Sequence, residues 1–301
     1  MLGAMETEDS QVPTPSPTTY KVISTPFQEK GHKYRELTDE EQSKLNSDKT
    51  LVSEFKQAKL EREAQKNWDL FYKRNSTHFF KDRHWTTREF QELTEKEPAD
   101  DGVSAGQRVL LEVGCGVGNA VFPLLDENKQ LFVHACDFSP RAVQFVKENA
   151  AYDPARISAF QCDITKDPLV AQIPECSVHI VTMLFVLSAI HPDKMAAALR
   201  NIYEVVRPGG CVLFRDYGLY DHAMLRFSRG HKLAEQFYVR QDGTRAYYFT
   251  EEMLSKLFSQ AGFEVCQNEY VLRETVNKKE GLCVPRVFVQ GKYSKPTQPN
   301  S

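Results

Sequence analysis

The residues with the most evident chemistry form a glycine-rich turn. An apolar run at residues 109–113 leads directly into Gly114, Gly116 and Gly118. Glycine lets a backbone come close to a ligand, and the turn after the first strand of a doubly wound sheet lies where nucleotides bind. Asp137 stands nineteen residues past Gly118, at the end of the next apolar run. Its carboxylate is therefore predicted to accept hydrogen bonds from both hydroxyls of a ribose.

The spacing of this turn distinguishes two nucleotide cofactors. A dinucleotide-binding turn has the pattern G-x-G-x-x-G, which needs glycine at position 119, where this chain has Asn119. The turn reads G-x-G-x-G instead and follows the acidic Glu112. S-adenosylmethionine has no pyrophosphate, and a carboxylate suits its amino end better than it suits a phosphate. The sequence therefore favours S-adenosylmethionine over NAD.

Two further features stand in register with the turn. Asp163 follows the third apolar run, where a carboxylate can accept from an adenine amino group. Residues 207–210 read RPGG, a turn that often precedes the fifth strand in adenosylmethionine-dependent enzymes. The alternative is that Asp137 and Asp163 only cap the helices that follow them. The glycine turn, both aspartates and the RPGG turn all occur at the expected places along the chain, and this argues against capping as their only role.

The elements that position these residues alternate in type. Apolar runs of strand length are separated by segments with helical periodicity, such as residues 140–149 and 192–206. This alternation predicts βαβ units, a parallel sheet and an α/β doubly wound, Rossmann-like domain. A helix over residues 250–261 precedes two strand-like segments, 263–273 and 286–293, which predict an antiparallel hairpin at the sheet edge. The apolar runs are residues 109–113, 131–136, 157–162, 178–184 and 211–215.

Composition excludes several protein classes. The chain has 301 residues, of which 41% are hydrophobic and 26% charged, and this suits one folded domain with appended tails. No run approaches the roughly 18 apolar residues of a membrane span. The formal charge of -3 means that any surface for nucleic acid must be local. The seven cysteines lack C-x-x-C spacing, so we interpret them as reduced core thiols and expect no metal.

The two ends of the chain differ from its middle. Residues 1–35 are rich in proline, serine and threonine and predict a disordered tail, and we expect the same of residues 296–301. Residues 36–90 begin with a capping box, Thr38 with Glu41, and predict an N-terminal helical extension. Residues 91–295 form the predicted domain around the glycine turn. The first thirty residues contain acids but no arginine, unlike a mitochondrial presequence, so we expect a cytoplasmic and possible nuclear location.

Two segments combine positive charge with aromatic residues. Residues 66–90 hold six basic and three acidic residues, and residues 215–245 hold six basic and four acidic ones. Phe79, Phe80 and Trp85 lie between the charges of the first segment. Such surfaces bind the phosphates and unstacked bases of single-stranded RNA. A solvated charged face has the same composition and stays an alternative.

Six stretches of the chain resemble the tRNA 3-methylcytidine methyltransferases, and the similarity covers about residues 51–295. They read QKNWDLFY (65–72), FFKDRHW (79–85), LEVGCGVGN (111–119), FVLSA (185–189), FRDYG (214–218) and FYVRQDGTR (237–245). The later run RETVNKKEGLCVPR (273–286) is most similar to the methyltransferase-like 6 branch of that family.

The resemblance implies a class I methyltransferase fold with S-adenosyl-L-methionine as cofactor. It also implies methylation at N3 of cytidine 32 in the anticodon loop of serine tRNAs, with seryl-tRNA synthetase as an assisting partner and no membrane. The extension would close over RNA and cofactor as a lid, although Trp68 and Tyr72 alone could equally dock one helix face. The cofactor residues that the resemblance implies are Trp68, Tyr72, Gly114, Asp137, Asp163 and Leu184.

The chemistry of this reaction defines what the remaining residues must do. Enzymes that methylate exocyclic amines often carry Asn or Asp and then Pro-Pro-aromatic after the fourth strand, whereas residues 183–189 read MLFVLSA. Cytosine N3 has a lone pair and no proton to lose, so the useful groups orient the base and stabilise positive charge. Asp216 is the candidate acceptor for the cytosine amino group, and Arg215 for its carbonyl or a phosphate. A structural network around Arg215 and Asp216 is the alternative.

Other functions remain open from the sequence. The candidate RNA contacts are Lys81, Arg83, His84, Arg240 and Arg245. If the two basic segments do not face the cofactor cleft together, methylation of a protein or a small molecule is favoured instead. A non-catalytic RNA-binding protein with a decayed cofactor site is the second alternative. The intact glycines, Asp137 and Asp163 argue against decay.

Overall fold

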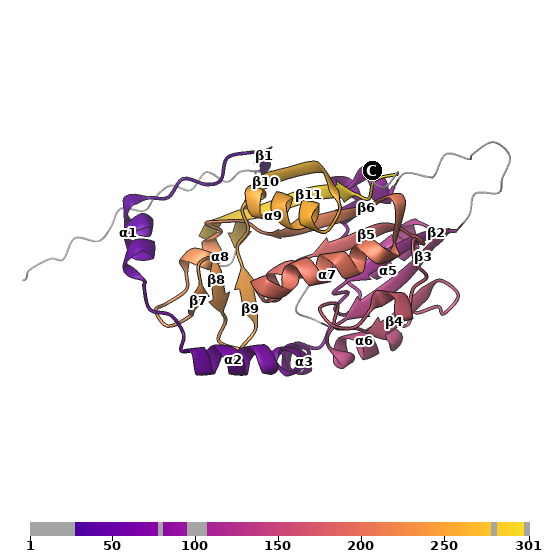
Figure 1. Cartoon of the computed structure of the whole chain (residues 1–301), viewed down its shortest axis with the longest axis horizontal. Coiled ribbons are helices and arrows are strands. Elements are labelled where there is room, and N and C mark those ends of the chain that lie inside the picture. Colours follow the sequence, from indigo (N-terminus) through magenta and orange to yellow (C-terminus); the bar gives the residue numbers. More distant parts are fainter. Residues whose placement is uncertain (1–27, 78–80, 95–106, 278–281, 298–301) are drawn as a thin grey trace, which may run out of the picture.

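The computed structural model describes residues 28–77, 81–94, 107–277 and 282–297 (Figure 1). The helices are α1 (Asp39–Ser47), α2 (Glu54–Arg62), α3 (Ala64–Asn75), α4 (Thr86–Glu89), α5 (Val121–Glu127), α6 (Pro140–Lys147), α7 (Pro192–Val205), α8 (His222–Leu225) and α9 (Glu251–Gln260), with 3-10 turns η1 (Gln91–Leu93), η2 (Leu169–Ala171) and η3 (Leu187–Ala189). The strands are β1 (Gln28–Gly31), β2 (Arg108–Val113), β3 (Leu131–Asp137), β4 (Ile157–Gln161), β5 (Val178–Leu184), β6 (Val206–Tyr217), β7 (Lys232–Ala234), β8 (Phe237–Val239), β9 (Arg245–Tyr247), β10 (Glu264–Asn277) and β11 (Leu282–Ser294). Among these residues, no helix combines the length and the apolar character that a membrane crossing requires.

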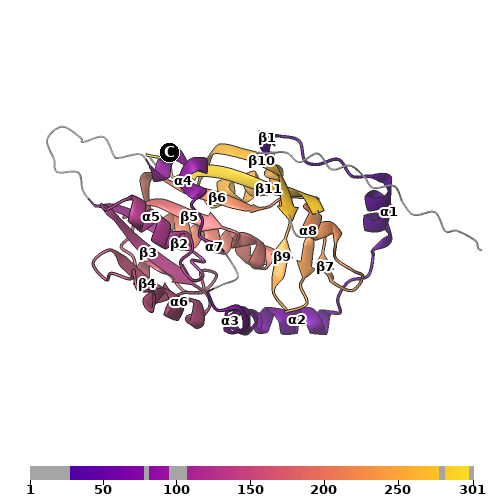
Figure 2. The same cartoon turned by 180° about the vertical axis from the view of Figure 1, so that it is seen from behind.

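An eight-stranded sheet forms the centre of the molecule, in the order β1-β10-β11-β6-β5-β2-β3-β4 (Figures 1 and 2). Strands β6, β5, β2, β3 and β4 are parallel, whereas β11, β10 and β1 pair antiparallel. The predicted α/β doubly wound sheet with antiparallel strands at one side is thereby confirmed. The chain runs from β2 outward to β4 on one side and then returns to β5 and β6 on the other. The carboxyl end of β2 is therefore the switch point at which such sheets bind ligands.

Helices cover both faces of this sheet. On one face, α7 buries Met195, Leu199 and Ile202, which share one helix side because they are spaced by three or four residues, and α9 packs beside it. On the other face, α5, α6 and the α4–η1 segment bury a second apolar layer that includes Val121 and Val146. These two layers hold the sheet rigidly, so its strand ends are fixed supports for a site.

The outermost strand comes from the N-terminal side of the chain. β1 pairs with β10 from Gln28 opposite Arg273 to Gly31 opposite Tyr270. The prediction of a disordered tail was therefore wrong for residues 28–31, and β1 rather than the β10–β11 hairpin forms this edge. The sequence of residues 28–31 has no strand pattern of its own. These residues form a strand because they pair with the otherwise open edge of β10. Residues 1–27 and 298–301 of the predicted tails lie outside the described residues.

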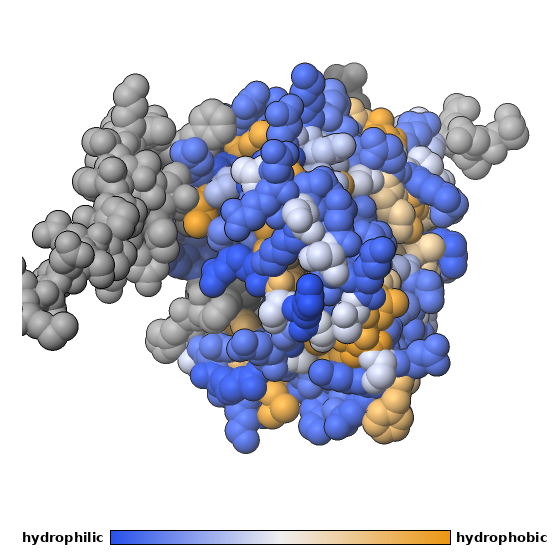
Figure 3. Space-filling model, turned by 90° about the vertical axis from the view of Figure 1, so that its left-hand side faces the viewer, coloured by the Kyte–Doolittle hydropathy of each residue, from blue (hydrophilic) through white to orange (hydrophobic). Residues whose placement is uncertain are grey.

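The described residues of the N-terminal extension contain four helices, α1 to α4. Thr38 caps α1, and reciprocal hydrogen bonds between Thr38 and Glu41 confirm the capping box. Helix α2 lies next to the ends of strands β7 and β9, and α3 lies beside α6 (Figure 2). On the face shown in Figure 3, hydrophilic residues predominate and hydrophobic ones form separate patches. Three large apolar side chains of the extension are exposed, Phe55 at 81%, Leu51 at 55% and Leu70 at 37%.

A second sheet lies between α8 and α9. Its three antiparallel strands, in the order β7-β8-β9, are not predicted by the sequence. Each strand has only three residues, which is too short for a period of two to be recognised. Isolated bridges join Leu51 to Lys232 and Gly218 to Phe249. This small sheet consequently lies between the extension and the end of β6.

The cysteines of the described residues only partly match the expectation of core thiols. Cys176 and Cys266 are exposed, because they lie in the turn before β5 and in the first residues of β10. The buried free cysteines are Cys115, Cys136, Cys162 and Cys211. In the described part of the chain, no group of three or more potential metal ligands occurs.

Glu89 ties the end of α4 to the sheet edge. It forms ion pairs with Lys30 of β1, at 3.2 Å, and with Arg273 of β10, and its side chain is 10% exposed. Although burial acts in the opposite direction, the positive charges of Arg215, Lys30 and Arg273 lower the pKa of Glu89. Glu89 therefore joins the Lys81–Trp85 region, through α4, to both outer strands.

We expect Glu89→Gln to lower the free energy of unfolding by about 1 kcal/mol, because it removes a charge from two ion pairs that solvent screens in part. Urea unfolding measures this loss. The control is Asp126→Asn, which removes a carboxylate from an exposed pair with Lys129 at 3.1 Å and should leave stability unchanged. Equal losses in both variants would contradict the role of Glu89.

Candidate active site

The glycine-rich turn joins β2 to α5. Gly114 and Gly116 adopt φ values of 62° and 54°, the left-handed region that glycine enters without steric cost. A Cβ at Gly114 would lie 2.4 Å from a methyl carbon of Val186, and a Cβ at Gly116 would lie 3.0 Å from the hydroxyl oxygen of Tyr72. Both positions therefore require glycine, because a side chain at either one would displace Val186 or Tyr72.

Asp137 ends β3 beside this turn. Its Oδ2 accepts from the Gly116 N–H at 2.8 Å, and its Oδ1 accepts from the Ser139 N–H at 2.9 Å. Each carboxylate oxygen has a further lone pair, so both can still accept a ribose hydroxyl. Burial raises the pKa of Asp137 to about 6, although the backbone N–H groups of Ser139 and Gly116 oppose this rise.

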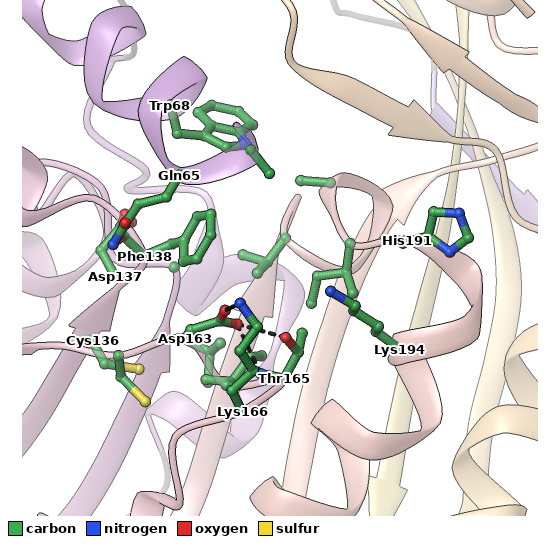
Figure 4. Close-up of a pocket in the computed structure, with 18 of the residues that line it drawn as sticks. Gln65, Trp68, Cys136, Asp137, Phe138, Asp163, Thr165, Lys166, His191 and Lys194 are labelled. Atoms are coloured by element: carbon green, nitrogen blue, oxygen red, sulfur yellow. Dashed lines mark hydrogen bonds and ion pairs between the residues drawn. The ribbon is translucent and has the colours of Figure 1, made fainter. Parts of the chain in front are cut away.

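A cavity of about 340 Å³ opens beside Asp137, and we call it the cofactor cavity (Figure 4). Gln65 and Trp68 of α3 border it on one side, and the loop after β4 borders it on the other. In that loop, Oδ1 of Asp163 accepts from Thr165 Oγ1 at 2.7 Å, and Oδ2 pairs with Lys166 Nζ at 3.1 Å. The predicted cofactor residues that line this cavity are Trp68, Tyr72, Gly114, Asp137 and Asp163. A glycine turn, a ribose acceptor and an aromatic cover fit an adenosine-containing cofactor.

Helix α3 is held over this cavity by polar contacts that the sequence analysis missed. Oδ1 of Asp69 accepts from Ser139 Oγ at 2.9 Å and from the Arg141 N–H at 3.2 Å, and Oδ2 pairs with the Arg141 guanidinium at 3.2 Å. Nε2 of Gln65 donates to the carbonyl of Phe138 at 3.1 Å. The partners are at least 70 residues apart in the chain, so no local pattern signals them.

Glu61 connects the end of α2 to α7 and β9 by ion pairs. It forms ion pairs with Lys194 and Arg245. Although burial acts in the opposite direction, hydrogen bonds from Lys194 and Arg245 lower the pKa of Glu61 to about 2. The extension is thus anchored on the main domain and on the small sheet.

A second cavity of about 310 Å³ adjoins the first. We call it the acceptor cavity, because a methyl acceptor would reach the cofactor from there. Six residues line both cavities, namely Trp68, Tyr72, Gly114, Phe185, Ala189 and Arg245. The other aromatic and cationic residues of the acceptor cavity are Trp85, Tyr217, Phe288, Lys81, Arg83, Arg240 and Arg286. Leu184, a predicted cofactor residue, lines the acceptor cavity and not the cofactor cavity, because β5 ends on that side of the glycine turn.

Glu112 is the one carboxylate among the described residues that line the acceptor cavity. Thr182 Oγ1 donates to its Oε2 at 2.5 Å. Burial raises the pKa of Glu112 to about 7, while the Thr182 hydrogen bond and the positive charge of Arg83 act in the opposite direction. Burial lowers the pKa of Arg83, and the charge of Glu112 opposes that change. The two side chains therefore stabilise each other's charged forms.

The two predicted catalytic residues line neither cavity. Asp216 is fully buried, and its carboxylate accepts from the N–H groups of Ser188 and Tyr217, both at 2.9 Å. Arg215 is 2% exposed, and its guanidinium carbon lies 4.7 Å from the ring centre of Trp85. The prediction that Asp216 and Arg215 contact the base is corrected accordingly. They instead fix Ser188, Tyr217 and Trp85, which do line the acceptor cavity.

The predicted RNA-binding residues fall into an inner and an outer group. Arg83 donates to the carbonyl of Leu184 at 3.2 Å, Arg240 donates to the carbonyl of Arg245 at 2.9 Å, and Arg245 pairs with Glu61. Lys81 and His84 are exposed, and only Lys81 of these two lines the acceptor cavity. The inner arginines therefore shape the cavity wall, and Lys81 is available at its surface. Phe79 and Phe80 lie outside the described residues.

We expect the affinity for S-adenosylmethionine to fall as the pH is lowered through about 6, because Asp137 then loses the charge that a ribose acceptor needs. The stability of the ligand-free protein depends on pH in the opposite direction. Because the folded pKa is raised, Asp137 favours the ligand-free fold at low pH, and this contribution disappears as the pH rises through about 6.

Calorimetric titration of Asp137→Asn measures this contribution. The variant should bind the cofactor more weakly by about 1 to 3 kcal/mol at neutral pH and should lack the part of the pH dependence that Asp137 causes. Glu112 and Asp216 also titrate in this range, with pKa values of about 7 and about 6, but both remain in the variant. Wild-type affinity at every pH would exclude Asp137 from the site.

Comparison with known proteins identifies the fold. A family model described as a methyltransferase domain matches residues 111–212. A chain of the complex between the Haloferax volcanii Trm112 methyltransferase activator and a putative methyltransferase has a TM-score of 0.56 at 16% identity, covering 79% of this chain and 100% of that one. A SAM-dependent methyltransferase from Anabaena variabilis has a TM-score of 0.56 at 15% identity, covering 77% and 94%. The fold is that of the S-adenosylmethionine-dependent methyltransferases, and S-adenosyl-L-methionine is the cofactor.

Curated relatives are similar over much more of the chain. The tRNA N(3)-cytidine methyltransferase METTL6 of Homo sapiens is 62% identical over 270 residues, which cover 90% of this chain and 94% of the relative. The tRNA N(3)-cytidine methyltransferase METTL2 of Xenopus tropicalis is 43% identical over 274 residues, which cover 81% of each. Because the similarity reaches well beyond the methyltransferase domain, the chain belongs to the tRNA N(3)-cytidine methyltransferase family.

Proposed function

We propose that this protein transfers a methyl group from S-adenosylmethionine to N3 of cytidine 32 in the anticodon loop of serine tRNAs. The observation that carries the proposal is the wall shared by the cofactor and acceptor cavities, at which ligands in the two cavities meet. The relatives named above act on N3 of tRNA cytidine. The resemblance of residues 273–286 to the methyltransferase-like 6 branch supports serine tRNAs as the substrates.

The acceptor cavity suits a reaction that creates positive charge. When bound, S-adenosylmethionine supplies an electrophilic methyl group. Cytosine N3 attacks with its own lone pair, so no residue has to remove a proton. Positive charge then develops on the pyrimidine, and the buried carboxylate of Glu112 stabilises it without having to reorient. Glu112, which the sequence places at the amino end of the cofactor, thus takes a role toward the base, and Asp216, which lines neither cavity, does not.

The walls of the acceptor cavity also suit an unstacked base. Trp85, Tyr217 and Phe288 offer aromatic faces, on which bases of single-stranded RNA stack. Both basic segments of the sequence contribute to this cavity, residues 66–90 through Lys81 and Arg83 and residues 215–245 through Arg240. The two segments thus border one cavity that adjoins the cofactor cavity, which supports the proposal. This favours RNA over a protein or a small molecule as the substrate.

The proposal includes seryl-tRNA synthetase as an assisting partner. The resemblance to the methyltransferase-like 6 branch supports it, and so do apolar side chains exposed on the extension. Phe55 is 81% exposed and Leu51 55% exposed, and aromatic and aliphatic side chains of this kind often contact other proteins. Phe55 lies on α2 and Leu51 lies just before it, and the same helix contributes Glu61 and Arg62 to the cofactor cavity.

Nucleoside mass spectrometry of tRNA incubated with the protein and S-adenosylmethionine tests the proposed function. Serine tRNA should gain 3-methylcytidine, while the same transcript with uridine at position 32 should gain none. A threonine tRNA transcript and a protein extract serve as competing substrates. Reactions with and without seryl-tRNA synthetase test the partner, which should raise the rate. Methylation of other tRNAs at the same rate would contradict serine specificity.

Lys81→Ala should weaken binding of serine tRNA and leave the affinity for S-adenosylmethionine unchanged, because Lys81 is exposed at the acceptor cavity. A variant that makes one phosphate contact fewer releases fewer counterions when it binds tRNA. The slope of the logarithm of the tRNA binding constant against the logarithm of the salt concentration should therefore decrease in magnitude by about 0.7. Fluorescence titration at several salt concentrations measures this slope. Lys129→Ala removes an exposed lysine that lines neither cavity and is the control. A wild-type slope for Lys81→Ala would exclude the phosphate contact.

A further inference from the structure

Phe185 has a backbone conformation that its side chain does not favour. It directly follows β5, and its φ is 62°. In this left-handed region the Cβ atom crowds a neighbouring carbonyl oxygen, so bulky side chains rarely occupy it. Such conformations persist where surrounding contacts enforce them, and they are concentrated at functional sites.

Contacts on both sides enforce this conformation. The N–H of Phe185 donates to the carbonyl of Arg215 in β6 at 2.8 Å. Just before it, the carbonyl of Leu184 accepts from Nη1 of Arg83 at 3.2 Å. Just after it, Val186 packs against Gly114, where no Cβ could fit. The backbone at Phe185 therefore cannot relax without disturbing β6, Arg83 or the glycine turn.

Phe185 is one of the residues that line both cavities. Its centre lies 5.2 Å from the guanidinium carbon of Arg83, 5.2 Å from the ring centre of Tyr217 and 5.5 Å from that of Phe288. These three neighbours line only the acceptor cavity. The ring is thus fixed from the acceptor side, in a residue that also borders the cofactor cavity.

From this placement we propose that Phe185 aligns the methyl donor with the acceptor base by contacting both ligands with one ring. The inference rests on the proposed function and adds to it the residue that sets the approach of the two reacting atoms. Because a misplacement of about 1 Å can cost about a hundredfold in rate, the ring should affect the rate of transfer more than the affinity for either ligand.

Single-turnover measurements on Phe185→Leu and Phe185→Tyr test the role of the ring. At saturating tRNA and cofactor, Phe185→Leu should be slower than wild type by about tenfold to a hundredfold, while Phe185→Tyr retains most of the rate. Dissociation constants for tRNA and S-adenosylmethionine should change less than threefold. The control is Phe263→Leu, which removes an equally large ring that is 3% exposed and lines neither cavity. A Phe185→Leu rate no lower than that of the control would overturn the proposal.

Thermal unfolding of glycine and alanine variants tests the backbone directly. Glycine tolerates positive φ and alanine does not, so Phe185→Gly should melt above Phe185→Ala. At Phe263, where φ is not positive, alanine should melt above glycine. If Phe185→Ala melts at or above Phe185→Gly, the left-handed conformation is not enforced in solution and the proposal fails.

These outcomes separate the inference from the proposed function. If wild-type protein forms 3-methylcytidine and Phe185→Leu forms it equally fast, the proposed function stands and the role of Phe185 is refuted. If wild-type protein forms none, the proposed function is refuted. The order of melting temperatures still reports on Phe185 in that case, because it requires no substrate.

Discussion

The carboxylate of Asp69 holds α3 against the first turn of α6, through Ser139 and Arg141. Ser139 caps α6 and also donates its N–H to Asp137, whose other oxygen accepts from Gly116. One continuous hydrogen-bond network therefore connects the extension, the ribose acceptor and the glycine turn. Together with the contacts of Gln65 and Glu61, this network holds Trp68 and Tyr72 over the carboxyl ends of the strands.

The arginines around the acceptor cavity are largely neutralised by the protein itself. Arg245 pairs with Glu61, Arg286 pairs with Asp221 at 2.8 Å, and Arg83 interacts with Glu112. A buried guanidinium is costly unless its charge is compensated, so these partners are expected. The inner cations consequently contribute rigid donors and aromatic contacts rather than a strong net field. Attraction of a polyanion must come mainly from exposed cations at the rim, such as Lys81.

The parts of the site that could be predicted are those encoded by local spacing. The glycine turn and Asp137 follow from short-range patterns, and so does the parallel sheet that carries them. The burial of Asp216 depends on Ser188, which is 28 residues away, and the pairing of Arg245 with Glu61 spans 184 residues. No local pattern encodes such contacts. The small sheet is likewise missed because its strands are stabilised by the extension and by β6 rather than by their own length.

Because Trp68 and Tyr72 line both cavities, the two ligands bind against the same helix. Thermodynamic linkage then applies: any factor by which tRNA strengthens cofactor binding is also the factor by which the cofactor strengthens tRNA binding. Methyl transfer would remove both a methyl group and a positive charge from the sulfur of the bound cofactor. Any resulting change in how the cofactor contacts that helix would, by the same linkage, change the affinity for tRNA.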